Sequence, residues 1–202
     1  MKIKICGITT SKEVVILNKL LPDYVGLVFA KSKRRITKKH AYKILTSLSN
    51  DIKRVGVFVD EKPSKVIEIA KYLKLDIIQL HGKEDNDYIT NIKQQLDIVI
   101  WKSFNITNQK QVTSILDCKA DYLVFDSNIA GSGVTADWSI NLDCIADKLI
   151  LAGGININNI SSAIKLFNPR VIDISTGVEV NGIKDEYKIN EIINYIRRDY
   201  NL

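Results

Sequence analysis

Eight short runs of apolar residues recur along this 202-residue chain, and a helix-like pattern follows each of them. The runs are rich in Val, Ile and Leu, as expected of strands whose two faces are both covered. Strands that alternate with helices indicate parallel βαβ units. Eight such units favour an α/β fold of the closed (β/α)8 type, the TIM barrel, over a doubly wound open sheet. The expected strands are Lys2–Ile5, Tyr24–Phe29, Lys53–Val59, Ile77–Leu80, Ile98–Lys102, Tyr122–Asp126, Leu149–Ala152 and Val171–Ile174.

The helices are predicted from apolar residues at helical spacing. Pro63 stands in the first turn of one helix, where proline is favoured, and Val66, Ile67 and Ala70 belong to the apolar stripe that follows it. No linker or low-complexity tract interrupts the alternation, so residues 1–202 are expected to form a single catalytic barrel domain. Besides the helix that begins at Pro63, whose apolar stripe includes Leu73, the expected helices are Ser11–Leu20, Lys38–Leu48, Glu84–Leu96, Asn108–Leu116, Ile140–Ala146, Asn158–Leu166 and Asp185–Arg198.

The sequence carries no signal for a membrane or for export. Apolar runs such as Ile98–Trp101 are far too short to span a bilayer. The chain starts within an expected strand rather than with a charged and then apolar leader, so export is not expected. Three cysteines fit a reduced, cytoplasmic setting better than a disulfide framework.

The formal net charge of +6 and the pI near 9.1 raise the question of nucleic-acid binding. The basic residues are spread along the chain, mostly on outer faces of expected helices, as in Lys38–Lys39, Lys71, Lys74 and Arg197–Arg198. Lysine on a helix exterior is the usual solution for a protein surface. We therefore expect no nucleic-acid partner, and a modest positive field would instead attract a small anionic substrate. The sequence sets no expectation for the oligomeric state.

Two groups able to transfer protons follow expected strands. Cys6 comes directly after the first strand, and Asp126 ends the sixth. TIM-barrel active sites form at the carboxyl ends of the strands, so a thiol and a carboxyl group there indicate acid–base chemistry. Cys6 taken alone also fits a buried structural cysteine, and Asp126 alone fits a cap or turn residue. Cys118 and Cys144 have no comparable position and are interpreted as structural.

Glycine segments follow the last two strands, where barrels of this type place phosphate groups. Gly153 and Gly154 precede an expected helix start, where backbone amides can approach an anion, and Ser175, Thr176 and Gly177 add two hydroxyl groups and another accessible amide. The alternative is that these glycines only supply positive φ in turns. A third glycine segment, residues 131–133, could form a loop over a substrate, although short Gly-Ser stretches are usually flexible connections.

An ordered set of motifs resembles the phosphoribosylanthranilate isomerase family, and the similarity covers essentially the whole chain. The motifs are Lys4-Ile5-Cys6-Gly7-Ile8-Thr9, Val55-Gly56-Val57-Phe58-Val59, Gln79-Leu80-His81-Gly82, Gly131-Ser132-Gly133 through Asp137-Trp138, Leu151-Ala152-Gly153-Gly154, Asp173-Ile174-Ser175-Thr176-Gly177-Val178-Glu179 and Lys184-Asp185.

This resemblance implies a (β/α)8 barrel that performs an Amadori rearrangement in tryptophan biosynthesis, with a small phosphoribosyl substrate. It implies that Asp126 is the general acid, Cys6 the general base and Arg34 the partner of the anthranilate carboxylate. It implies no organic cofactor and no metal. His81 is interpreted as a hydrogen-bonded structural residue rather than a base. No second histidine or carboxylate stands at metal-ligand spacing from it, so the sequence gives no metal site there.

The chain departs from the family pattern in its loops. The segment between Phe29 and Ser32 is one residue short and lacks a proline, so the adjacent Arg35 competes with Arg34 for the carboxylate role. The segment after Asp126 is also short and carries Ala130 where glycine is common. Open alternatives are another phosphate-binding aldose–ketose isomerase barrel, and a non-catalytic protein that binds phosphoribosyl ligands.

Overall fold

The computed structural model describes residues 1–126 and 140–200. Eight parallel strands close into a barrel in the order β1 to β8, each hydrogen-bonded to the next along the chain. The expected (β/α)8 fold is therefore confirmed. The strands are β1 (Lys2–Cys6), β2 (Tyr24–Val28), β3 (Lys53–Phe58), β4 (Ile77–Leu80), β5 (Val99–Phe104), β6 (Tyr122–Asp126), β7 (Leu149–Ala152) and β8 (Val171–Ile174).

Helices connect the strands, and a short hairpin follows the last one. The α-helices are α1 (Ser11–Leu20), α2 (Lys38–Leu45), α3 (Pro63–Leu73), α4 (Asn86–Gln95), α5 (Gln109–Ser114), α6 (Ile160–Phe167) and α7 (Glu186–Tyr200). The 3-10 helices are η1 (Asp143–Lys148) and η2 (Thr176–Val178), and the strands of the antiparallel hairpin are β9 (Glu179–Val180) and β10 (Ile183–Lys184).

The expectation of an α-helix over Ile140–Ala146 is wrong. Residues 143–148 fold instead as η1, in which Ile145 is buried, and the cap residue Leu142 just before it is buried as well. Residues three apart lie on one edge of a 3-10 helix, so this tighter helix buries both side chains within a single short turn.

Local chemistry sets where the helices begin. Thr10 caps α1, and the Glu13 carboxylate accepts the backbone N–H groups of Thr9 and Thr10, which completes a capping box. Helix α4 begins two residues later than expected because Asp85 is its cap. Glu84 lies before that cap and instead accepts the amides of the loops around it.

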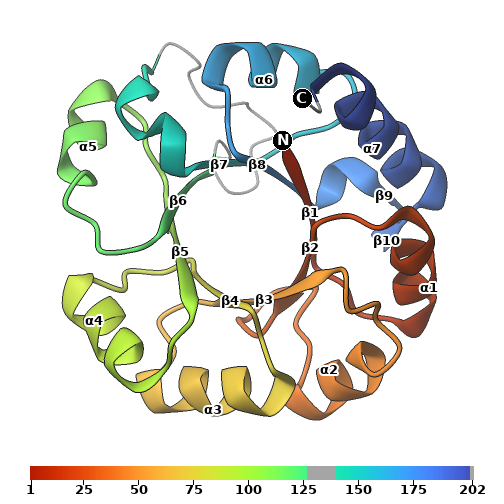
Figure 1. Cartoon of the computed structure of the whole chain (residues 1–202), viewed down its shortest axis with the longest axis horizontal. Coiled ribbons are helices and arrows are strands. Elements are labelled where there is room, and N and C mark those ends of the chain that lie inside the picture. Colours follow the sequence, from red (N-terminus) through yellow and green to blue (C-terminus); the bar gives the residue numbers. More distant parts are fainter. Residues whose placement is uncertain (127–139, 201–202) are drawn as a thin grey trace. The chain divides into compact units, whose positions relative to one another are not determined.

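The chain divides into two compact units, and the unit of Ile5–Ser103 and Cys118–Asp121 contains β2 to β4 and all of β5 except Phe104. Helices α1 to α4 lie outside these strands (Figure 1). The strands pair in parallel register, with Tyr24 opposite Lys53 and Gln79 opposite Trp101. The Tyr24 and Trp101 rings meet edge to face with centroids 5.1 Å apart. Apolar and aromatic side chains thus fill this half of the core.

The other unit is formed by Met1–Lys4, Phe104–Asp117 and Tyr122–Leu202. It contains β6 to β8, which pair in parallel, and helices α6 and α7 outside them (Figure 1). The expectation of one domain over residues 1–202 stays a prediction. Within the described ranges, no helix is both long and apolar enough to cross a membrane.

Candidate active site

Cys6 is the last residue of β1, and its side chain is half-buried. The chain turns immediately afterwards, because Gly7 has a φ of +86°, a conformation that favours glycine. The amides of Gly7 and Ile8 both donate to the Gly26 carbonyl at the neighbouring strand, at 2.9 and 3.0 Å. The backbone just after Cys6 is therefore held by hydrogen bonds to β2, which fixes the position of the strand end that carries the thiol.

Arg34 is the arginine that lies at this strand end. A Cβ atom added to Gly7 would lie 2.3 Å from Arg34 Cδ, so the arginine side chain crosses directly over the Gly7 backbone. Arg35 is exposed and pairs through its backbone with Val28. The geometry places Arg34 rather than Arg35 next to the turn after Cys6, and its role toward a carboxylate stays a prediction.

Asp126 is the last residue of β6, as the sequence predicted, and its side chain is half-buried. It lies opposite Ala152 at the end of β7 in the parallel register. The glycine segment 131–133 and the motif residues Asp137 and Trp138 lie outside the described residues.

The two glycines after β7 both adopt positive φ, +88° at Gly153 and +63° at Gly154. Asparagine side chains hold the loop that follows. The amide groups of Asn156 and Asn159 each donate to the Gly154 carbonyl at 3.0 Å. Helix α6 starts at Ile160, two residues after the expected Asn158, because Asn159 occupies the cap position. Both glycines thus supply positive φ in the turn after β7, and their role toward a phosphate stays a prediction.

Gly177 has a different structural reason from the other two. A Cβ at this position would lie 1.9 Å from the Ile155 carbonyl oxygen, so only glycine allows the loop after β8 to pack against the loop after β7. Ser175 and Thr176 stand just before it, with Ser175 half-buried and Thr176 exposed. The structure therefore brings together the backbones of the two segments that were predicted to hold phosphate.

His81 follows β4 and is exposed, while its backbone N–H donates to the Phe58 carbonyl at 2.8 Å. Its ring atom Nδ1 lies 3.5 Å from Nε2 of the buried Gln79, which also donates to Ser103 Oγ at 3.3 Å. A structural role for His81 stays a prediction. In the described part of the chain, no group of three or more His, Cys, Asp or Glu side chains has the geometry to hold a metal ion.

Three buried lysines are functional candidates that the sequence reasoning missed, since it placed basic residues on helix exteriors. Lys4 pairs with Asp173, Lys102 with Glu84 and Lys184 with Glu179, and none of the three lysines is more than 3% exposed. A signal for the last pair was present: Asn181-Gly182 is the dipeptide typical of a two-residue hairpin turn, which brings the flanking residues together. Both turn residues do adopt positive φ.

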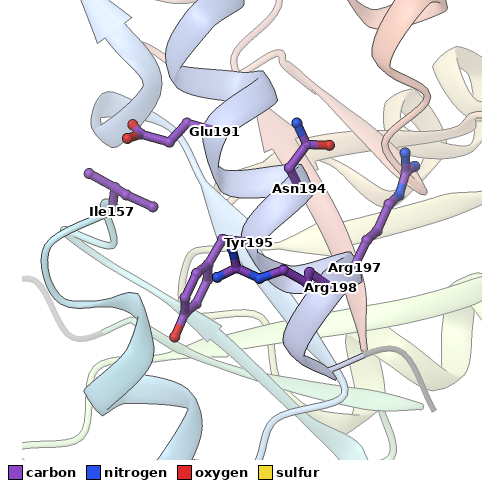
Figure 2. Close-up of a pocket in the computed structure, with 6 residues that line it drawn as sticks. All are labelled: Ile157, Glu191, Asn194, Tyr195, Arg197 and Arg198. Carbon is purple, nitrogen blue, oxygen red and sulfur yellow. The ribbon is translucent and has the colours of Figure 1, made fainter.

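A surface cavity of about 620 Å³ lies elsewhere, against α7. Figure 2 shows the lining side chains Tyr195 and Arg198 on α7, with Arg197 directed to another side of the helix. The other lining residues are Ile157, Glu191 and Asn194. None of the predicted catalytic or substrate-binding residues lines this cavity.

Comparison with known proteins decides the family. The family model described as N-(5'-phosphoribosyl)anthranilate (PRA) isomerase matches residues 3–195. This chain belongs to that family. N-(5'-Phosphoribosyl)anthranilate isomerase of Clostridium acetobutylicum is 41% identical over 205 residues, covering 98% of each chain. The enzyme of that name from Clostridium kluyveri is 40% identical over 198 residues, with 98% of each chain covered.

Solved structures of phosphoribosylanthranilate isomerases have the same fold. The crystal structure of the Thermotoga maritima protein superposes with a TM-score of 0.88 at 34% identity, covering 98% of this chain and 99% of that one. A phosphoribosylanthranilate isomerase in complex with reduced 1-(o-carboxyphenylamino)-1-deoxyribulose 5-phosphate has a TM-score of 0.84 at 34% identity, covering 96% and 97%. The matched range contains every residue predicted for the site, from Cys6 to Gly177.

Proposed function

We propose that this chain converts N-(5'-phosphoribosyl)anthranilate into 1-(2-carboxyphenylamino)-1-deoxyribulose 5-phosphate, the isomerisation step of tryptophan biosynthesis, with Cys6 and Asp126 as base and acid. The observation that carries the reaction is the family match over residues 3–195. The relative that holds a reduced form of this product supports the same substrate class. The chain is therefore an aldose–ketose isomerase.

The reaction needs two proton transfers. Asp126 donates a proton to the ribose ring oxygen, the bond between C1 and that oxygen breaks, and the anilino nitrogen forms a Schiff base with C1. Cys6 as thiolate then takes the proton from C2, and the electrons of that C–H bond move toward the nitrogen to give an enolamine, which tautomerises to the aminoketose. Atoms and electrons balance within one substrate molecule, so the proposal includes no cofactor and no metal.

The strand ends support these roles. In a parallel barrel, the carboxyl ends of all strands share one rim, where active sites form, and Cys6 and Asp126 are the last residues of β1 and β6. Each group is half-buried and so remains accessible to a substrate. The assignment requires Asp126 to be protonated and Cys6 deprotonated when the substrate binds.

The two ends of the substrate are both anions, and the proposal gives each its own group of residues. Arg34 binds the benzoate carboxylate, which a guanidinium can contact through two parallel hydrogen bonds. Gly153, Gly154 and Gly177 present backbone to the phosphate, and Ser175 and Thr176 supply hydroxyl groups. The close packing of Gly177 on the Ile155 carbonyl supports a single cradle built from both loops.

Loss of substrate fluorescence tests the catalytic roles. We expect Cys6→Ala and Asp126→Asn each to reduce kcat by about 10²–10⁴-fold, the usual contribution of one general acid or base. Binding of the reduced product analogue should persist in both variants, because neither side chain holds the phosphate or the benzoate carboxylate. Variants that turn over at a near-native rate would eliminate these assignments.

We also propose that residues 1–202 act as one catalytic domain in the cytoplasm. The three cysteines, all within the described residues, form no disulfide, which is compatible with a reducing compartment. The family match runs through both compact units, which supports a single functional domain.

A further inference from the structure

A buried ion pair lies in the hairpin that follows the predicted phosphate loop. Lys184 in β10 is 3% exposed, and its Nζ lies 2.6 Å from Glu179 Oε1 in β9, directly opposite in the antiparallel register. Burial of both charges costs desolvation free energy, and such pairs often add little to stability. A contribution to stability alone therefore does not explain why this ion pair is buried here.

The Lys184 ammonium also contacts Ser175, one of the residues predicted to bind phosphate. Its Nζ lies 3.0 Å from the Ser175 carbonyl oxygen and 3.4 Å from Ser175 Oγ. Glu179 Oε1 is a further acceptor of the same ammonium, at 2.6 Å. A lysine ammonium can only donate. The Ser175 hydroxyl must therefore accept this bond, and its own hydrogen is directed to another partner.

We propose that Lys184 is a positioning residue of the phosphate site, which fixes Ser175 as a hydrogen-bond donor to the phosphate and neutralises Glu179. The inference rests on the proposed function and extends it to a residue that does not touch the substrate. Lys184 holds both the backbone and the side chain of Ser175, so its loss releases the residue at two points. Serine hydroxyl groups rotate freely unless a partner orients them.

The charge of Glu179 gives the role a second component. Without Lys184, a buried carboxylate would remain close to the segment that receives a phosphate, and an uncompensated buried charge is strongly unfavourable. Like charges also repel across short distances more strongly inside a protein than in water. Removal of the lysine should therefore weaken anion binding, whereas removal of the glutamate charge should not.

If the ion pair between Lys184 and Glu179 only stabilised the hairpin, substitution of its two residues would be expected to give a different result. The hairpin has other ties: the Asp185 N–H donates to the Val178 carbonyl at 2.9 Å, and Lys188 Nζ donates to the Glu179 carbonyl at 2.9 Å. If the ion pair only held the hairpin, loss of either partner would weaken phosphate binding to the same degree. A positioning role predicts weaker phosphate binding on loss of the lysine only.

Calorimetric titration with inorganic phosphate tests the inference, because it does not depend on turnover. Lys184→Met should raise the phosphate Kd by about tenfold or more, comparable to the loss of one charge-assisted hydrogen bond. Glu179→Gln should leave this Kd unchanged or lower it. Lys188→Met is the matched control, since it removes a nearby lysine that contacts the same hairpin but not Ser175, and it should change the Kd by less than about twofold.

Kinetics of the same variants separate this inference from the proposed function. Lys184→Met should raise KM for phosphoribosylanthranilate far more than it lowers kcat. A wild-type protein without isomerase activity would refute the proposed function. An active wild type whose Lys184→Met variant binds phosphate with an unchanged Kd would refute the role of Lys184. A Glu179→Gln variant that binds phosphate as weakly as Lys184→Met would refute it too.

A second variant covers the case in which Lys184→Met does not fold. The double variant Lys184→Met/Glu179→Gln buries no lone charge and should still bind phosphate more weakly than wild type. Unchanged binding would overturn the proposal.

Discussion

Single residues set the geometry of the predicted substrate-binding end, and Gly7 is the clearest case. Its φ of +86° turns the chain after Cys6, and the Arg34 side chain occupies the space where a Cβ would lie. The residue thus has two constraints, one conformational and one steric. Because of the steric constraint, the position of Arg34, the predicted carboxylate-binding residue, depends on the backbone next to Cys6, the predicted base.

Gly7→Ala should displace Arg34 and weaken binding of the benzoate end. We expect a destabilisation of about 1–2 kcal/mol from the left-handed conformation alone, together with a raised KM and a raised inhibition constant for anthranilate. The matched control is Gly182→Ala, whose φ of +79° imposes the same strain but whose added Cβ meets no atom within 4 Å. That variant should lose stability without changing inhibition by anthranilate, and equal effects at both positions would exclude the steric link to Arg34.

At the residue scale, the sequence pattern placed Cys6 and Asp126 at strand ends, where barrels form their active sites, and both residues do end their strands in the structure. Their catalytic roles stay predictions. The buried Lys184 was missed although Asn181-Gly182 signals the hairpin, because Glu179 becomes its partner only after the hairpin forms. The Arg34 register was left open by the sequence and depends on packing over Gly7.

Strands were predicted more accurately than helices, for a physical reason. The bounds of β4, β6, β7 and β8 agree with the sequence pattern, because buried parallel strands are short apolar runs with sharp ends. Helix ends depend on capping side chains, and η1 is set by the burial of Leu142 and Ile145. The pattern of apolar residues does not distinguish a short α-helix from a 3-10 turn.

Helix α4 is tied to the loop after β3 by a tyrosine with a shifted pKa. The Tyr88 hydroxyl donates to the Glu61 carbonyl at 2.5 Å. Burial first, and then the neighbouring carboxylates of Glu84, Glu61 and Asp60, raise the pKa of Tyr88 well above its usual value. A raised pKa means that the folded state holds this proton when the unfolded chain releases it. The contribution to stability is therefore complete below about pH 10, the pKa of an unfolded tyrosine, and is lost as the pH rises further.

Tyr88→Phe should remove this dependence. We expect the variant to lose less of its free energy of unfolding between neutral and strongly alkaline pH than wild type, while being less stable at neutral pH because the bond to the Glu61 carbonyl is gone. Urea denaturation at a series of pH values measures both effects. Tyr187→Phe, at a tyrosine that is 73% exposed, is the control and should follow wild type. An alkaline decline as steep in Tyr88→Phe as in wild type would contradict the assignment.

At the scale of the whole molecule, the barrel closes where the first and last strands meet. Lys4 of β1 and Asp173 of β8 form an ion pair at this seam, with 2.6 Å between Nζ and Oδ2 and exposed side-chain fractions of 0% and 7%. The fold class was predictable from eight repeated units, but this ion pair was not. A lysine within a strand is expected to be exposed to solvent unless the sequence also identifies a buried partner. Closure of the barrel supplies that partner from a position 169 residues away.

Lys4→Met should therefore destabilise the protein strongly, because it leaves the Asp173 carboxylate buried without its partner. We expect a loss of about 3–5 kcal/mol in the free energy of unfolding, the usual cost of breaking a buried pair, measured by urea denaturation at pH 7. The double variant Lys4→Met/Asp173→Leu should recover most of this loss, since no lone charge remains.

Arg170→Ala is the matched control. It removes a surface ion pair in which the side chains of Arg170 and Asp147 are 60% and 91% exposed, and it should lower the free energy of unfolding by no more than about 1 kcal/mol. A Lys4→Met protein as stable as the Arg170→Ala protein would mean that the carboxylate is neutral or solvated, and that the seam is held by strand pairing alone.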